Sequence, residues 1–312
     1  MPSFATEVKN ELARLMYDKD CCRTAELAAL LRMGAVMTIG SGHALGLAFT
    51  TENAAVARKT LTLLKSSGNE VQTEVTVSRS RRLKKNNSYS VRVVPSPRVG
   101  ALLERLGLMH GMSLNVGTDS AILRRQCCRV AYLRGAFLGG GSVNRPEVSC
   151  HLEMVTGSYP FAQLLVSILR RMDLPAGMTD RKNDYVIYMK EGDAILDFLG
   201  MLQAEKAVEE FEIARNVKEV RNQVNRLVNC ETANLQKTVD AAGRQIDAIR
   251  RLAAAGHLAG LPGSLRETAE VRLAHPDASF SELAELLGIG KSGINHRLRK
   301  LAKLAADLSE GE

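Results

Sequence analysis

A short string near the start of the 312-residue chain recurs 106 residues later, and this internal repeat limits the possible folds. The two copies read CCRTAEL at 21–27 and CCRVAYL at 127–133. Farther along, Asn87-Ser88-Tyr89 and Asn183-Asp184-Tyr185 precede runs, SYSVRVV and DYVIYMK, in which every second residue is apolar or aromatic. This alternation is typical of a half-buried strand. Two matches in the same order indicate a duplicated unit, so we expect two related halves within residues 1–202.

Each copy predicts the order helix, strand, helix, strand, strand, helix. In the first copy the expected helices cover 23–37, 52–66 and 97–109, and the strands cover 43–50, 70–79 and 88–94. In the second copy the helices cover 127–140, 158–172 and 192–202, and the strands cover 147–155, 176–181 and 184–190. This mixture favours an α+β fold in which helices cover antiparallel sheets.

After Gly200 the strand signal ends, and residues 203–228 predict one long helix or a bent pair. The polar stretch 225–238 is expected to interrupt it, with Thr232 as the N-cap of a helix that runs to about residue 255. Asn222, Arg226 and Asn229 share one helical face. They could read bases, but we expect them to bond backbone at the helix break.

From Ser264 onward the pattern is three short helices. The first covers 265–274, a capping box formed by Ser279 and Glu282 begins the second, and Gly288-Ile-Gly290 makes a turn before the third. In that last helix Ile294, Leu298 and Leu301 are expected to face inward. These features predict a helix-turn-helix whose final helix enters the major groove of DNA.

The final helix supplies candidate DNA contacts. We expect Ser292, Asn295 and His296 to reach base edges and Lys291, Arg299 and Lys300 to bind phosphates, with Arg297 as a further cation. The alternative is a helical hairpin used only for protein contacts. Residues 261–312 hold 7 basic and 8 acidic side chains, which predicts modest DNA affinity for this part alone.

The net charge of +8 comes from residues 1–202, which hold 26 basic and 18 acidic side chains. Such an excess is the footprint of a nucleic-acid binder. The segment between the strands at 70–79 and 88–94 is expected to be a basic rim that contacts phosphates, although it could be a solvated loop. The basic rim comprises Arg79, Arg81, Arg82, Lys84, Lys85, Asn86, Asn87 and Tyr89.

The six cysteines show neither CxxC nor Cys/His spacing, so we expect no metal and no cofactor. Cys21, Cys22, Cys127 and Cys128 are interpreted as small buried apolar residues, because adjacent cysteines rarely point at one metal. No apolar run approaches the roughly 20 residues of a membrane helix, and the start of the chain lacks a signal peptide core. We therefore expect a cytoplasmic, nucleoid-associated protein.

The segments LAALLRMGA at 27–35 and LRGAFLGGG at 133–141 resemble the LAGLIDADG helix of homing endonucleases. The resemblance implies two helices packed face to face between two saddle-shaped sheets. Small residues would permit that close approach, namely Ala28, Ala29, Gly34, Gly135 and Gly139.

The same resemblance places the metal-binding acid of active enzymes just before the last glycine of each motif. Those positions hold Gly34 and Gly140, and the earlier acid of the motif is replaced by Arg32 and Leu138. Because hard metal ions need oxygen ligands, we expect a nuclease scaffold without catalytic residues. The nearest carboxylates, Glu26 and Glu147, are expected to lie away from the metal-binding end.

Over nearly its full length the chain resembles the WhiA family of bacterial regulators. The strings that carry the resemblance include SFATEVKNELARL, CCRTAELAALLRMGA, TENAAVAR, RLKKNNSY, CCRVAYLRGAFLGGGSVNRP, RLVNCETANLQKTV and LAELLGIGKSGINHRLRKL. The predicted organisation is an N-terminal helix at 1–20, a duplicated domain at 21–202 with repeats at 21–113 and 127–202, a helical linker at 203–260 and a helix-turn-helix at 261–306.

The resemblance implies a transcriptional regulator that binds double-stranded DNA through a helix-turn-helix like that of sigma factors. It implies roles in cell division, chromosome segregation and, in some lineages, sporulation, with a WhiB-like iron–sulfur regulator as partner where one exists. Two alternatives stay open. One is a residual metal-dependent endonuclease, and the other is an interaction scaffold of the division machinery.

Overall fold

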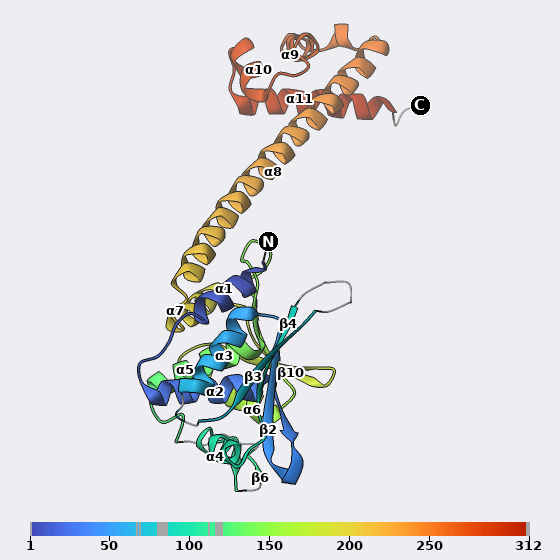
Figure 1. Ribbon diagram of the computed structural model, residues 1–312. Coiled ribbons are helices and arrows are strands. Elements are labelled where there is room, and N and C mark those ends of the chain that lie inside the picture. Colours follow the sequence, from blue (N-terminus) through green and yellow to red (C-terminus); the bar gives the residue numbers. More distant parts are fainter. Residues whose placement is uncertain are drawn as a thin grey trace. The chain divides into compact units, whose positions relative to one another are not determined.

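The computed structural model describes residues 2–66, 68, 70–79, 87–111, 113–115 and 121–309 (Figure 1). The chain divides into two compact units, Met1–Glu219 and Val220–Glu312. The boundary falls within the predicted linker, and each unit is described by itself. No helix in the described part of the chain is both long and apolar enough to cross a membrane.

The first unit contains the duplicated αββαββα domain. After α1 (Phe4–Leu12), the elements of the first copy are α2 (Asp20–Gly34), β1 (Ala35–Ile39), a 3-10 turn (Ser41–His43), β2 (Leu45–Thr51), α3 (Ala54–Ser66), β3 (Thr73–Arg79), β4 (Asn87–Val93) and α4 (Pro97–Arg105). The short strands β5 (Met109–His110) and β6 (Ser113–Leu114) follow. Those of the second copy are α5 (Gln126–Gly140), β7 (Gly141–Val143), β8 (Leu152–Thr156), α6 (Tyr159–Arg170), β9 (Gly177–Arg181), β10 (Asp184–Met189) and α7 (Gly192–Met201).

The two copies form matching antiparallel sheets, with strand orders β1-β2-β4-β3 and β7-β8-β10-β9. The duplication and the α+β class are therefore confirmed. One element of each copy was missed, because β1 and β7 begin directly where the central helix ends. The helix expected at 23–37 stops at Gly34. Its apolar continuation, Ala35-Val36-Met37, fits a short strand as well as a buried helix, so periodicity alone did not separate them.

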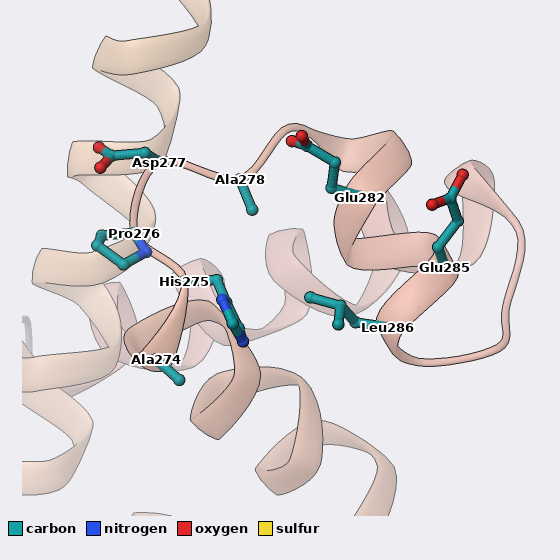
Figure 2. A pocket seen from close by; sticks show the side chains of 8 residues that line it. All are labelled: Ala274, His275, Pro276, Asp277, Ala278, Glu282, Glu285 and Leu286. Atoms are coloured by element: carbon teal, nitrogen blue, oxygen red, sulfur yellow. The ribbon is translucent and has the colours of Figure 1, made fainter.

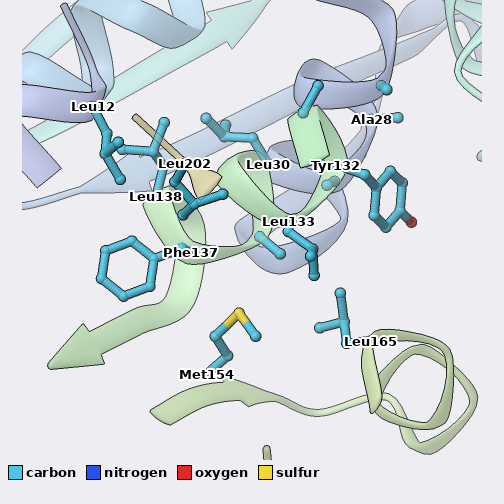
Figure 3. Close-up of a cluster of buried hydrophobic side chains, with 14 of the residues drawn as sticks. Leu12, Ala28, Leu30, Tyr132, Leu133, Phe137, Leu138, Met154, Leu165 and Leu202 are labelled. Carbon is cyan, nitrogen blue, oxygen red and sulfur yellow. The ribbon is translucent and has the colours of Figure 1, made fainter. Parts of the chain in front are cut away.

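Helices α2 and α5 pack against each other at the centre of this unit. Figure 3 shows Leu30 from α2 near Leu133 and Leu138 from α5, with Met154 of β8 and Leu165 of α6 below them. The glycines of α5 allow the close approach. A Cβ added at Gly135 would overlap the carbonyl oxygen of Glu26, and one added at Gly139 would lie 2.5 Å from Met33 Cβ.

One ion pair is buried beside this packed helix pair. Lys59 Nζ lies 3.1 Å from Glu26 Oε2, and both side chains are fully buried. Lys59 also donates to the carbonyl oxygen of Leu15. Burial raises the pKa of Glu26, and the positive charges of Lys59 and Arg134 oppose that rise. The Arg134 guanidinium stacks 4.1 Å from the centre of the Tyr17 ring. These contacts connect α2, α3, α5 and the segment before α2.

The helix α8 (Glu205–Ala254) runs without a break through the boundary between the two units. The expected interruption at 225–238 is therefore wrong, and Asn222, Arg226 and Asn229 are exposed on a continuous helix rather than bonded at a break. The helix accommodates its polar residues locally, as Thr238 Oγ1 donates to the Asn234 carbonyl oxygen at 2.9 Å. The stretch contains no glycine or proline, and the helix propensities of its polar residues are too weak to end a helix by themselves.

The second unit ends in the predicted helix-turn-helix. After a 3-10 turn (Leu258–Gly260) come α9 (Gly263–Ala274), α10 (Phe280–Leu286) and α11 (Lys291–Ser309). The capping box is confirmed, since the Ser279 N–H donates to Glu282 Oε2 at 2.7 Å. Gly288 has a φ of +62°, which glycine adopts without strain, in the turn before α11. Ile294, Leu298 and Leu301 are buried as predicted.

We expect Gly135→Ala to destabilise the first unit by about 1–3 kcal/mol, because the added methyl group overlaps the backbone of α2. Gly200→Ala is the matched control, since nothing lies within 4 Å of its added Cβ on α7. Urea unfolding of both variants measures the difference. Equal stability of the two variants would contradict the close packing of α2 and α5.

The capping box should make the start of α10 sensitive to acid. The backbone N–H of Ser279 lowers the pKa of the Glu282 carboxyl, so the bond is fully present above the unfolded pKa of about 4.3 and is lost as the pH falls through the lowered value. In Glu282→Gln this acid dependence should disappear. Amide hydrogen exchange in α10 between neutral and acidic pH measures it, and an unchanged acid response in the variant would contradict it.

Candidate nucleic-acid interface

The exposed side of α11 carries most of the predicted DNA contacts. The helix begins at Lys291, and Ile294, Leu298 and Leu301 anchor one side of it in the core of the helix-turn-helix. Because residues three or four apart share a helical face, polar residues of α11 form a stripe roughly opposite that anchor. The stripe comprises Ser292, Asn295, His296, Arg299 and Lys303, with Lys291 and Lys300 at its flanks.

Exposure within the stripe fits contact with a ligand. Ser292, His296, Arg299 and Lys303 are exposed, as are Lys291 and Lys300, and Asn295 is half-exposed. The stripe holds cations, hydroxyl and amide groups, and the first acid on this face of α11 is Asp307, four residues after Lys303. This chemistry suits phosphate oxygens and the base edges of a major groove.

Arg297 lies apart from the stripe. Its Nη1 donates to the Ser264 carbonyl oxygen and to Thr268 Oγ1, both at 3.3 Å and both on α9. Arg297 therefore joins α11 to α9. The sequence shows only that Arg297 is positively charged, and this does not separate a structural arginine from one that contacts DNA.

A hollow of about 760 Å³ in the same unit is unsuited to phosphate. It lies between the end of α9 and α10, and Figure 2 shows Asp277, Glu282 and Glu285 around it, with His275 below. Three acidic side chains repel a polyanion. The hollow therefore does not extend the candidate interface.

The basic rim is described only at its edges. Arg81, Arg82, Lys84, Lys85 and Asn86 lie outside the described residues. The strands on either side are paired, with Arg79 opposite Asn87 in the antiparallel register of β3 and β4. Both of these residues are exposed. Tyr89 is half-buried and packs against the core, on the same face of β4 as Val91.

The outward faces of the two sheets carry both signs of charge. In the first sheet Arg92 is paired in register with Glu74. In the second, Glu153 lies 3.4 Å from His151 Nε2 and 3.7 Å from Arg181 Nη1. The described sheet faces therefore supply no uniformly basic surface.

The positions of the missing catalytic acids have apolar or backbone surroundings. A Cβ at Gly34 would lie 3.2 Å from the Phe49 ring, and one at Gly140 would meet the end of Met33 and the Val155 carbonyl oxygen. The alternative acids are elsewhere: Glu26 is buried against Lys59, and Glu147 is exposed in the segment between β7 and β8.

The cysteine pairs, interpreted from the sequence as separate apolar residues, lie together. Their four Sγ atoms lie within 4.8 Å of one another, and no other group of three or more possible His, Cys, Asp or Glu ligands occurs among the described residues. Spacing rules missed this group because they search one segment at a time. The repeat itself was the signal, since equivalent positions of two helices that pack together can meet.

Three family models match successive parts of the chain. The WhiA N-terminal LAGLIDADG-like domain matches residues 20–109, the WhiA LAGLIDADG-like domain matches 129–221, and the WhiA C-terminal HTH domain matches 224–305.

Curated relatives match over nearly the whole chain. A "Probable cell division protein WhiA" of Desulforamulus reducens is 50% identical over 314 residues, which cover 99% of this chain and 97% of that protein. A protein with the same description from Heliobacterium modesticaldum is 48% identical, and the match covers 98% of this chain and 97% of that protein.

Solved structures show the same architecture. The full-length DUF199/WhiA of Thermatoga maritima is 26% identical to this chain, with a TM-score of 0.56. The match covers 98% of this chain and 99% of that protein's chain. The N-terminal LAGLIDADG domain of DUF199/WhiA is 23% identical, covers 65% of this chain and 91% of its own, and has a TM-score of 0.51. The second likeness concerns the fold alone.

We expect Arg297→Ala to destabilise the helix-turn-helix by about 1 kcal/mol, because it removes the bonds to Ser264 and Thr268. The exposed Arg299 is the matched control on the same helix, and Arg299→Ala should change stability by less than about 0.5 kcal/mol. Amide hydrogen exchange in α9 and α11 compares them. A larger effect at Arg299 would reverse the assignment of the two arginines.

Proposed function

Because the chain belongs to the WhiA family, we propose that it is a non-catalytic regulator that binds double-stranded DNA and acts in cell division. The observation that carries the proposal is the exposed stripe of cationic and polar residues on α11, which lies roughly opposite the residues that anchor this helix in the core. Cell division is the role stated in the descriptions of the curated relatives.

Sequence-specific contact is assigned to the start of α11. Asn295 and His296 would reach base edges, with Ser292 beside them, because side chains in the first turns of a recognition helix enter the major groove. Lys291, Arg299 and Lys300 would bind phosphates and set the register of the helix on the duplex. Arg297 would act indirectly, by keeping α11 in position against α9.

The first unit would add affinity without specificity. Its outward sheet faces are mixed in charge, so the basic rim is the best source of phosphate contacts. Arg79 and Asn87 lie exposed at the ends of the strands that enter and leave it. Since Tyr89 packs on the core side of β4, its role in the rim would be to support that strand.

The chemistry at the ends of α2 and α5 supports the proposed absence of catalysis. Phosphodiester cleavage by this class of scaffold needs divalent metal ions held by carboxylate oxygens. Gly34 and Gly140 offer no ligand, and Glu26 is committed to Lys59 in the interior. Cleavage would require acids that none of these contacts provides.

Finer roles are also proposals. We infer that promoter DNA is the target and that division is controlled through transcription, with chromosome segregation and, in sporulating lineages, sporulation as connected outcomes. A nucleoid-associated location follows from DNA binding. A WhiB-like regulator would be a partner only in lineages that possess one.

The test is DNA binding by the intact chain, with duplexes selected from a random pool by the unmodified protein. We expect Asn295→Ala to weaken binding to the selected duplex by about 1–3 kcal/mol and to relax specificity, Arg299→Ala to weaken binding to every duplex, and Arg266→Ala, an exposed arginine on α9, to have no effect. Equal loss in all three variants would contradict base reading by α11.

A second comparison separates the contribution of the basic rim. Replacing Arg81, Arg82, Lys84 and Lys85 by alanine should weaken binding to every sequence and reduce the dependence of affinity on salt. An unchanged salt dependence would remove the rim from the interface. Incubation with Mg²⁺ followed by a denaturing gel should show intact DNA. Metal-dependent strand cleavage would overturn the non-catalytic assignment, and no DNA binding would favour the scaffold alternative.

A further inference from the structure

The four clustered thiols come from equivalent positions of the duplicated unit. Cys21 and Cys22 lie in the first turn of α2, and Cys127 and Cys128 lie in the first turn of α5. The two sulfur atoms of each pair are 4.0 Å apart, and all four lie within 4.8 Å of one another. The packing of α2 against α5 thus brings together four soft ligands that are far apart in sequence.

The spacing of the four sulfur atoms is close to that of a tetrahedral metal centre. A Zn–S bond of about 2.3 Å in tetrahedral geometry places the ligand sulfur atoms about 3.8 Å from one another. The observed distances between sulfur atoms are 4.0 Å within each pair and at most 4.8 Å overall. They exceed the tetrahedral value by about 1 Å or less, which rotation of the cysteine side chains can close. A set of four sulfur ligands without oxygen selects a thiophilic ion and disfavours calcium and magnesium.

Positive charge lies beside the cluster, although burial raises the pKa of Cys22 and of Cys128. The N-terminal end of a helix carries partial positive charge, and both cysteine pairs lie at such an end. Arg125 Nη1 lies 3.8 Å from Cys21 Sγ.

Two further arginines hold the cluster's supporting loops in matching geometry. Arg23 Nη1 donates to the Tyr17 and Asp18 carbonyl oxygens at 3.1 and 2.8 Å. Arg129 Nη1 donates to the equivalent carbonyl oxygens of residues 123 and 124 at 3.2 and 3.3 Å. Each arginine directly follows a cysteine pair and fixes the chain that leads into its helix. The ligand-bearing turns are therefore built alike on both sides.

The cluster can be reached from solvent. A hollow of about 410 Å³ is lined by Cys21 and Cys128 together with Arg105, Arg124 and Arg125. A metal ion could enter by this route, and the arginines would balance the net negative charge of a divalent ion bound by four thiolates. Cys22 is buried and does not line the hollow, so the site is closed on its inner side.

We propose that Cys21, Cys22, Cys127 and Cys128 bind one zinc ion that joins the first turns of α2 and α5. The ion is structural, because all four coordination positions are filled by protein sulfur and none is left for water or substrate. It stabilises the junction between the two halves of the duplicated domain. This role does not depend on the proposed DNA binding.

The experiment is a cobalt titration of the intact chain, stripped of metal with a chelator and kept reduced. Four thiolates around Co²⁺ should produce intense visible absorption of a tetrahedral ion and a thiolate-to-metal charge-transfer band, saturating at one ion per chain. Zinc should displace the cobalt and raise the temperature of unfolding. Cys150→Ser and Cys230→Ser are matched controls, since both cysteines lie outside the cluster, and they should change neither result.

A double variant, Cys21→Ser with Cys127→Ser, replaces the two half-exposed ligands and leaves the buried ones in place. It should keep its circular dichroism spectrum yet lose tetrahedral cobalt binding and the zinc-dependent rise in unfolding temperature. Arg125→Ala should weaken cobalt binding by about tenfold, as for residues that support metal ligands. If the double variant does not fold, the zinc content of the unmodified chain and the effect of Arg125→Ala decide the matter.

Three results would overturn the proposal. The first is a reduced, unmodified chain that gives no tetrahedral cobalt spectrum. The second is a spectrum that persists in the folded double variant. The third is recovery of the unmodified chain with a disulfide among these cysteines, or with iron in place of zinc.

Discussion

The close approach of α2 and α5 is the constraint on which the rest of the first unit depends. Gly135 and Gly139 allow the two helices to approach closely, and apolar side chains of both helices belong to one core with those of the sheets and the outer helices. Because the same contact repeats along two equivalent helices, it brings together pairs of equivalent residues. The thiols lie at one end of the helix pair, and Gly34 and Gly140 lie at the other.

Burying the charged side chains next to this contact costs free energy. Removing Glu26 and Lys59 from water is costly, and their mutual attraction offsets the cost only while both remain. Arg134 shares the same interior and is held by the Leu202 carbonyl oxygen at 3.0 Å and Gln203 Oε1 at 2.9 Å. Polar groups with such specific partners permit few alternative arrangements of α2, α3 and α5.

The sequence was sufficient where its signal was local or repeated. The CCRxAxL repeat predicted two related halves, and Ser279, Glu282 and Gly288 predicted the helix-turn-helix in detail. It was insufficient where neighbours far away in the chain decide the outcome. The residue types at 35–39 suit a strand and a helix equally, and the pairing of this segment with β2 makes it a strand. The charge of Arg297 likewise does not reveal that its hydrogen-bond acceptors lie on α9. The convergence of the cysteines depends likewise on helix packing.

The glycines at 34 and 140 limit what an added side chain could do at the ends of α2 and α5. A Cβ at 140 would meet the flexible end of Met33 and would lie 2.8 Å from the Val155 carbonyl oxygen, which belongs to the backbone of β8. A Cβ at 34 would lie 3.2 Å from the Phe49 ring, which is tight but leaves the backbone in place. A carboxylate introduced at 140 would therefore have to displace a strand before it could hold a metal ion, so a substitution at this position changes the packing of the second half before it changes its chemistry.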